Sequence, residues 1–299
     1  MSSPGPPTTP IPRRGPLRRW GVRIARAIVL VFAGLAMFLY FIQDRLVFPG
    51  SELQGQRDAT LTEGENNSLL TLHTRDGTRI TALFGLALTS DGLPIADVKD
   101  RPTILFFYGN GACMAYSTDV FDALRRLGVN VLIPDYEGYG MSAGRPSEAG
   151  CYATADAAYD YLLGRDDIDR GKIVAMGWSL GGAVAIDFAS RRPVAGLITI
   201  SAFTNLRDMA HRVLPWFPVS WILKYRFANL DKLPEIKCPI LIIHGTRDDL
   251  VPFSMAARVA AAAGGKVTRF DVHGAGHENV FDMGGDAMLK TIAQFLNSL

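Results

Sequence analysis

The chain has 299 residues, 48% of them hydrophobic, which is enough for one large α/β domain or two small ones. Its formal net charge is only +2, and no lysine or arginine stripe alternates with aromatic residues, so nucleic acid is excluded as the main partner. The three cysteines, Cys113, Cys151 and Cys238, fit neither a metal-ligand pattern nor a full set of disulfides. We interpret them as buried small hydrophobic residues.

The N-terminus predicts a membrane anchor. Residues 1–20 are rich in proline and arginine and are predicted to be a disordered basic tail. Residues 21–43 are predicted to form a transmembrane anchor, because Ala27–Ile42 carries no charge and shows no polar face. A cleaved signal peptide would have a small-x-small site after its apolar run, whereas Gln43–Phe48 follows here, so the anchor is predicted to be uncleaved.

The charges beside this anchor predict its orientation. Six arginines lie within the fourteen residues before Ala27, and only Arg45 and Arg57 lie within a similar distance after Ile42. Because positively charged flanks remain in the cytoplasm, we expect the tail on the cytoplasmic side and the folded domain on the other side, which is the periplasm in a bacterium.

Residues 44–299 show the alternation of strands and helices that is typical of a doubly wound, mostly parallel sheet. A hairpin around Asp76-Gly77 opens the domain. The strands are expected at 69–73, 79–88, 103–108, 129–134, 172–176, 194–200, 240–244 and 267–272, and helices at 120–127, 147–163, after Ser179 and around 287–296. Residues 203–236, rich in aromatics and prolines, are expected to form a small apolar cap inserted above the sheet.

A nucleophile elbow is indicated by Gly177-Trp178-Ser179-Leu180-Gly181, which follows a short apolar run and precedes a small-residue helical pattern. The glycines permit a sharp turn between strand and helix, and Ser179 stands at its tip. Because Ser179 needs a base and the base needs a carboxylate, two loops downstream are informative. Asp248 and His277 follow the last two expected strands, in the chain order of an α/β-hydrolase.

Neighbouring residues compete for both roles. His273 is the main rival for the base, but it lies at a strand terminus, whereas His277 lies beyond two glycines on a loop free to approach the serine. Asp249 is the rival for the acid and is otherwise a turn residue. The oxyanion hole is expected from the backbone N–H groups of Leu180 and of Asn110, in the loop after Tyr108.

The chain resembles membrane-anchored serine hydrolases of the alpha/beta-hydrolase-domain-containing family, which are distantly related to protein depalmitoylases. The similarity covers about residues 40–299, and its marks are Gln43–Pro49, Tyr108–Gly111, Asp135–Ser142, Gly177–Gly181, Phe203–Met209, His244–Pro252 and Gly276-His277. It implies an α/β-hydrolase fold, a triad of Ser179, Asp248 and His277, and an oxyanion loop at Asn110.

Two residues depart from the family pattern. Tyr108 stands where the family usually carries His, and Glu137 stands where Arg is common, which affects loop hydrogen bonding rather than the triad. Relatives of the depalmitoylase type also act on the cytoplasmic face, opposite to the side that the charge bias predicts. We give the charge bias more weight, because it acts directly on insertion.

We therefore expect a serine hydrolase that cleaves an ester or thioester of a small or lipid-like acyl substrate, with no metal and no organic cofactor. An acyltransferase with the same triad, or a non-catalytic membrane-bound interaction protein of the same fold, are the alternatives. A dehalogenase or an epoxide hydrolase is disfavoured, because each requires a carboxylate in place of Ser179.

Overall fold

Two compact units make up the chain in the computed structural model, which describes residues 5, 16–64 and 66–299. The first unit ends at Gln43 and the second extends from Asp44 to Leu299. Helix α1 runs over Pro16–Val47, with a proline at its start, where the missing N–H would lack an intrahelical acceptor anyway. Residues 16–20 of the predicted tail are therefore helical, and the rest of that tail, Gly5 excepted, lies outside the described residues.

Helix α1 contains a long apolar stretch, Trp20–Val47, whose most apolar 18 residues have a mean hydropathy of 2.2 and are not buried by the chain itself. A helix of this length spans about 42 Å at 1.5 Å per residue, more than the ~30 Å hydrocarbon core of a bilayer. By length and composition, α1 is therefore able to cross a membrane.

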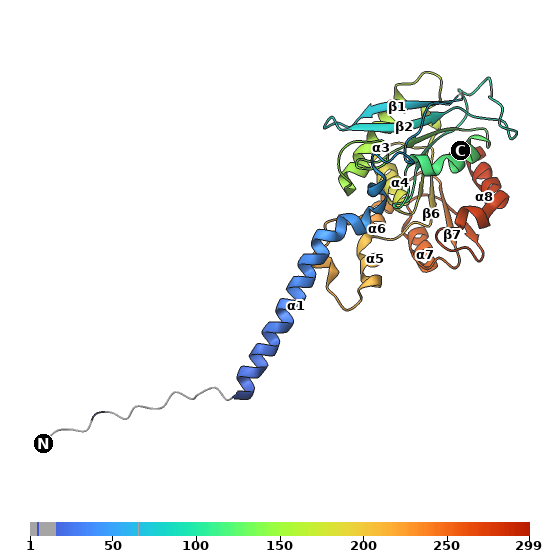
Figure 1. Ribbon diagram of the computed structural model, residues 1–299. Helices are drawn as coiled ribbons and strands as arrows, with labels where there is room; N and C mark the ends of the chain where they lie inside the picture. Colours follow the sequence, from blue (N-terminus) through green and yellow to red (C-terminus); the bar gives the residue numbers. More distant parts are fainter. Residues whose placement is uncertain (1–4, 6–15, 65) are drawn as a thin grey trace. The chain divides into compact units, whose positions relative to one another are not determined.

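A sheet of eight strands organises the described residues of the second unit, in the order β1-β2-β4-β3-β5-β6-β7-β8. Figure 1 shows the paired strands β1 and β2 side by side, and likewise β6 and β7. The hairpin pair β1-β2 and the pair β2-β4 are antiparallel, and every other pair is parallel, as the sequence predicted. The strands are β1 Asn67–His73, β2 Arg79–Gly85, β3 Thr103–Phe107, β4 Asn130–Pro134, β5 Ile173–Trp178, β6 Gly196–Ile200, β7 Ile240–Gly245 and β8 Val267–Val272.

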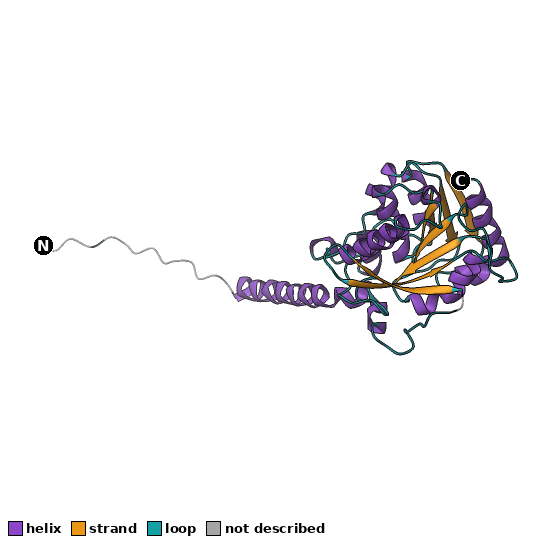
Figure 2. Cartoon of the chain, turned by 90° about the horizontal axis from the view of Figure 1, so that it is seen from above, coloured by secondary structure: helices purple, strands orange, loops and turns teal. Residues whose placement is uncertain are grey.

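Helices cover the sheet, and the strands from β3 to β7 are buried almost throughout (Figure 2). Burial on both faces explains why these strands read as continuous apolar runs. The helices are α2 Thr118–Arg125, α3 Glu148–Leu163, α4 Leu180–Arg191, α5 Leu206–Val213, α6 Asn229–Lys232, α7 Phe253–Ala262 and α8 Val280–Asn297.

Two helices outside the cap differ from the sequence prediction, and α5 and α6 lie in the expected cap, where no helices were predicted. Helix α7 was not predicted, although it buries Met255, Ala256 and Val259 on one face, because its alanines obscure the apolar stripe. Helix α8 begins at Val280 rather than near residue 287. Gly285 has φ 43° and ψ −139° and kinks the helix, so the element continues across a glycine with non-helical geometry.

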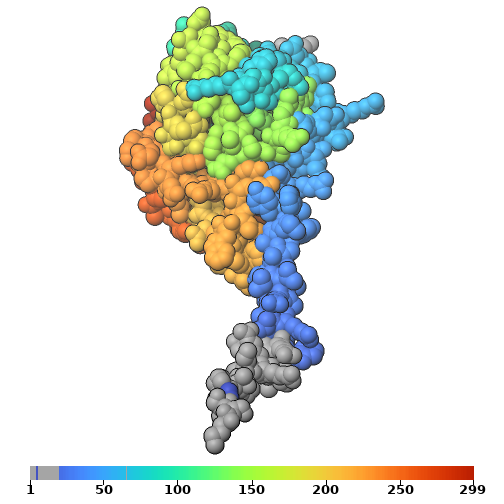
Figure 3. Space-filling view, turned by 90° about the vertical axis from the view of Figure 1, so that its left-hand side faces the viewer, coloured from blue at the N-terminus to red at the C-terminus, as the bar shows by residue number. Residues whose placement is uncertain are grey.

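The expected cap corresponds to the segment between β6 and β7, which holds α5, α6 and two short 3-10 turns, Val219–Trp221 and Leu233–Glu235. In the space-filling view this segment forms a continuous orange area on the surface of the second unit (Figure 3). Its aromatic side chains divide into two groups, since Phe217 and Phe227 are buried whereas Trp216 and Trp221 are 62% and 86% exposed.

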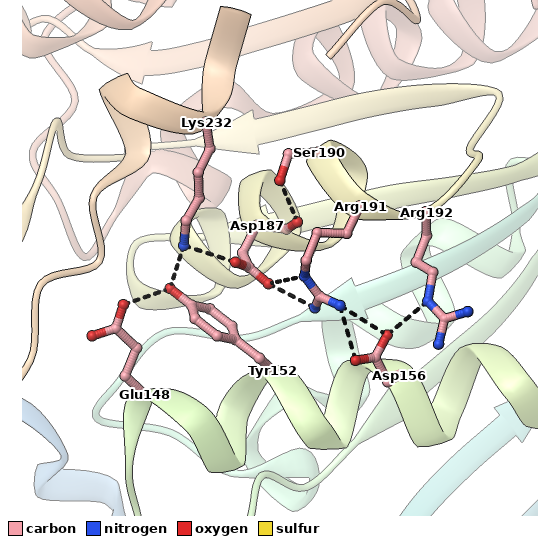
Figure 4. Close-up of polar contacts among 8 residues, drawn as sticks. All are labelled: Glu148, Tyr152, Asp156, Asp187, Ser190, Arg191, Arg192 and Lys232. Atoms are coloured by element: carbon pink, nitrogen blue, oxygen red, sulfur yellow. Dashed lines mark hydrogen bonds and ion pairs between the residues drawn. The ribbon is translucent and has the colours of Figure 1, made fainter. Parts of the chain in front are cut away.

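A network of charged side chains attaches the end of the cap to helices α3 and α4 (Figure 4). Its centre is the buried carboxylate of Asp187 on α4, which lies 2.7 Å from Lys232 Nζ on α6 and 2.7 Å from an Arg191 nitrogen. Lys232 also donates to the Tyr152 hydroxyl, which donates to Glu148 on α3. Because α4 begins directly after Ser179, this network joins the cap to the helix that follows the elbow serine.

Candidate active site

Ser179 occupies a strained turn between β5 and α4, with φ 56° and ψ −115°. Such a conformation costs about 1–3 kcal/mol in a non-glycine residue and is typical of functional sites. The flanking glycines make the turn feasible, because a Cβ on Gly177 would lie 2.0 Å from the Gly181 carbonyl oxygen, and one on Gly181 would lie 1.9 Å from that of Phe107. The N–H of Ser179 donates to Ile200 on the neighbouring strand at 2.8 Å.

The structure brings Ser179, His277 and Asp248 into one chain of hydrogen bonds. His277 Nε2 lies 2.9 Å from Ser179 Oγ, and His277 Nδ1 lies 2.8 Å from Asp248 Oδ2. All three residues are at least nine-tenths buried. Their loops follow β5, β7 and β8, whose carboxyl ends meet at one edge of the sheet, where ligands bind in open α/β sheets.

Both carboxylate oxygens of Asp248 have hydrogen-bond partners. Its Oδ1 accepts the N–H groups of Val251 at 2.7 Å and Leu250 at 3.1 Å, while Oδ2 faces His277. Burial alone would raise the pKa of Asp248, but the hydrogen bond with His277 and the N–H of Val251 outweigh it and hold that pKa below its ordinary value. Asp248 is therefore ionised near neutral pH, whereas its rival Asp249 has an exposed side chain.

The loop after β3 lies directly beside the serine. A Cβ placed on Gly109 would be 3.6 Å from Ser179 Cβ. Within the described residues, the next N–H, that of Asn110, donates to no protein acceptor, although the carbonyl and side chain of this residue are both bonded. Leu180 is the first residue of α4, so its N–H has no acceptor within the helix. Two backbone donors thus flank Ser179.

The comparisons with known proteins agree with this architecture. The sequence pattern described as "alpha/beta hydrolase fold" matches residues 102–221, and the one described as "TAP-like protein" matches residues 220–299. The alpha/beta hydrolase domain-containing protein WAV2 of Arabidopsis thaliana is 32% identical over 89% of this chain and 91% of its own length. The chain belongs to the alpha/beta hydrolase domain-containing family.

Two further known proteins are similar to most of this chain. An uncharacterised protein of Mycobacterium tuberculosis is 33% identical over 91% of this chain and 94% of its own length. The solved structure of the Pyrococcus furiosus esterase Pf2001 has a TM-score of 0.62 at 18% identity, covering 78% of this chain and 90% of that one, and shows the shared fold. The fold is thus that of an α/β-hydrolase.

The two departures from the family pattern lie beside the β3 loop and at the start of α3. The Tyr108 hydroxyl donates to the buried carboxylate of Asp135 at 2.9 Å, and Tyr136 donates to the Tyr108 carbonyl at 2.8 Å, so tyrosines support the loop here. Glu137 is buried, and burial raises its pKa. A Cβ on Gly150 would lie 2.8 Å from the Glu137 carboxylate, so Glu137 lies against the N-terminal turn of α3.

One neighbour of the acid was missed at the sequence level. His244 Nε2 lies 3.5 Å from Asp248 Oδ2 and 2.9 Å from the Val251 carbonyl oxygen. Burial lowers the pKa of His244, so the ring is neutral near pH 7 and donates Nε2–H to that carbonyl. Its position four residues before the acid, at the end of a strand, was the signal that could have identified it. The remaining histidines, His73, His211 and His273, are exposed.

In the described part of the chain, no group of three or more His, Cys, Asp or Glu side chains is arranged so that it could hold a metal ion. The cysteine thiols are not paired with one another. Cys113 and Cys151 are buried and Cys238 is half-buried. The chemistry available at this edge of the sheet is therefore that of a hydroxyl, an imidazole, a carboxylate and two backbone N–H groups.

Proposed function

We propose that the protein is a serine hydrolase that cleaves carboxylic ester or thioester bonds through an acyl-Ser179 intermediate. The observation that carries the proposal is the continuous hydrogen-bond chain from Ser179 Oγ through His277 to Asp248, at 2.9 Å and 2.8 Å. A serine hydroxyl is a weak nucleophile at neutral pH, and this arrangement supplies the base that activates it.

In the first half-reaction, His277 Nε2 accepts the proton as Ser179 Oγ attacks the acyl carbon. The ionised Asp248 holds the proton of His277 on Nδ1 and stabilises the imidazolium. Asn110 and Leu180 donate their N–H groups to the oxyanion of the tetrahedral intermediate. His277 then gives its proton to the leaving alcohol or thiol, and the acyl group remains on Ser179.

In the second half-reaction, water takes the place of the leaving group. His277 Nε2 removes a proton from this water as its oxygen attacks the acyl carbon, and the same two N–H groups stabilise the second oxyanion. Collapse of this intermediate returns the proton to Ser179 and releases the carboxylic acid. These steps require no metal and no organic cofactor.

The substrate class that we propose is an amphiphilic acyl compound. An exposed apolar helix, α1, and a cap with exposed tryptophans support a site that works at a lipid surface. We also propose that α1 is an uncleaved single-pass anchor and, from the arginine bias, that the catalytic domain lies on the non-cytoplasmic side.

A fluorophosphonate reagent tests the proposal, because it forms a covalent bond only with an activated serine. We expect labelling of the full-length chain and its loss in Ser179→Ala. Ser201→Ala is the matched control, since Ser201 also has a positive φ, 48°, and follows the adjacent strand β6. Its hydroxyl has no hydrogen-bond partner within the described residues, so labelling should persist in Ser201→Ala. Equal labelling of the parent chain and Ser179→Ala would refute the assignment.

A further inference from the structure

Residues 44–50, here called the junction segment, connect helix α1 to the catalytic domain and take no part in the steps above. The segment begins within the last turn of α1, and Pro49 then opens a short 3-10 turn, Pro49–Leu53. Within the segment, Phe48 and Gly50 are fully enclosed by the domain, which is unusual for a connection between two units. Its packing therefore serves a purpose beyond linkage.

The cap holds the start of the junction segment. The Asp44 carboxylate accepts hydrogen bonds from Lys224 Nζ at 3.1 Å and from the Tyr225 hydroxyl at 2.8 Å. The buried ring of Phe48 meets Tyr225 edge to face, with centroids 4.9 Å apart, and lies 6.2 Å from the ring of Phe227. The segment is thus fixed by a polar contact at one end and an aromatic cluster in its middle.

Residues at the end of the junction segment form hydrogen bonds with Asn110, whose N–H lies beside Ser179. The Asn110 side chain donates from Nδ2 to the Val47 carbonyl at 3.1 Å, and the Asn110 carbonyl accepts the N–H of Gly50 at 2.8 Å. The Tyr139 hydroxyl donates to the same carbonyl at 3.1 Å. With its side chain and carbonyl both bound, Asn110 has little freedom to turn its N–H away from the serine.

Gly50 allows this close approach. A Cβ added to it would lie 2.6 Å from the Ala112 carbonyl oxygen and 2.7 Å from that of Asn110. Both contacts are shorter than any real Cβ tolerates, and both partners are backbone atoms of the loop beside Ser179. A side chain at residue 50 must therefore displace this loop.

We propose that the junction segment is a positioning element of the active site, in which Val47 and Gly50 orient the Asn110 N–H toward the oxyanion. This inference rests on the proposed function, because it requires an oxyanion beside Ser179. It makes the last turn of α1 and the residues directly after it a part of the catalytic apparatus. The path from Asp44 to the oxyanion loop is covalent along the segment and is completed by one hydrogen bond at Val47 and one at Gly50.

Gly50→Ala in the full-length chain, purified in detergent, tests the proposal. We measure kcat and KM for a p-nitrophenyl ester, and the inhibition constant of a trifluoromethyl ketone, whose adduct with serine carries an oxyanion. Loss of one oxyanion donor lowers kcat by about 10²–10³. Because Gly50→Ala displaces the donor without deleting it, we expect kcat to fall by about 10- to 100-fold, ketone affinity to weaken by a similar factor and KM to stay nearly constant.

Two further variants complete the design. Gly34→Ala is the matched control, because a Cβ there meets nothing within 4 Å in the chain, and it should retain parent kinetics. Asn110→Ala adds no atoms and removes only the bond from Nδ2 to Val47, so it tests the proposal if Gly50→Ala does not fold. It should lower kcat and ketone affinity together. In the double variant with Gly50→Ala and Asn110→Ala, kcat should fall by less than the product of the two single-variant factors, because both substitutions act on one loop.

Suppose that hydrolysis by the parent chain requires Ser179. If Asn110→Ala and folded Gly50→Ala then keep the parent kcat and the parent affinity for the ketone, this inference is overturned and the proposed function stands. A fall in kcat with unchanged ketone affinity would also overturn it, since that result indicates a general structural effect. Absence of Ser179-dependent hydrolysis in the parent chain would instead overturn the proposed function, and this inference with it.

Discussion

Asp248→Asn changes one oxygen of the acid into an amino group and leaves its shape intact. The remaining oxygen would still accept the N–H groups of Val251 and Leu250, now 2.7 Å and 3.1 Å from Oδ1, so the new nitrogen occupies the place of Oδ2. That place is 2.8 Å from His277 Nδ1. Because an amide nitrogen donates, Nδ1 must become an acceptor, and the proton of His277 moves to Nε2. Nε2 then can no longer accept the proton of Ser179.

A reversed tautomer of this kind lowers kcat by about 10⁴, or about 5.5 kcal/mol of transition-state stabilisation. The assay is p-nitrophenyl ester hydrolysis by the purified full-length chain. Asp249→Asn is the matched control, since the same exchange on an exposed carboxylate should change kcat by no more than about twofold. A loss below tenfold in Asp248→Asn, or a larger loss in Asp249→Asn, would refute the assignment of the acid.

Three other predictions follow from the structure. Asp187→Ala removes the carboxylate that binds Lys232 and Arg191, and because both partners are partly hydrated we expect a loss of about 2 kcal/mol and a Tm lower by about 4–8 °C, with hydrolysis retained. An unchanged Tm would contradict the role of the network. The pKa of His244 in the folded chain lies below its ordinary value, so the unfolded chain binds more protons below about pH 6.5, and the free energy of unfolding should fall from pH 7 to pH 5. His244→Gln, which keeps a donor for the Val251 carbonyl, should flatten this decline, and identical profiles would argue against it. In bacterial cells, alkaline phosphatase fused to the C-terminus should be active and a green fluorescent protein fusion dark, and the opposite pair would place the domain in the cytoplasm.

Much of this architecture was predictable from the sequence, because the informative residues lie where buried strands end. Ser179, Asp248 and His277 each follow an apolar run and stand in a turn that contains or follows a glycine, so strand topology alone brings them to one edge of the sheet. The sequence also predicted the parallel sheet, since strands buried on both faces are recognisable as apolar runs.

Other features depend on tertiary packing that local patterns do not reveal. Helix α7 was missed because a buried face made largely of alanine gives no clear apolar stripe. The start of α8 was placed too late because Gly285, an unfavourable residue inside a helix, is accommodated there by tertiary packing. His244 was not predicted as a site residue, although β7 places it 3.5 Å from the acid. The contact of Gly50 with Asn110 joins residues sixty positions apart, so only the folded chain reveals it.

The most direct test of the central claim is the site of the covalent acyl group. The full-length chain is mixed with a p-nitrophenyl ester, quenched in acid within the first turnover, and digested for mass spectrometry. We expect an added acyl mass on the peptide that contains Ser179, and no acylated peptide in Ser179→Ala. An acyl group on another residue, or steady hydrolysis by Ser179→Ala at the parent rate, would contradict this claim.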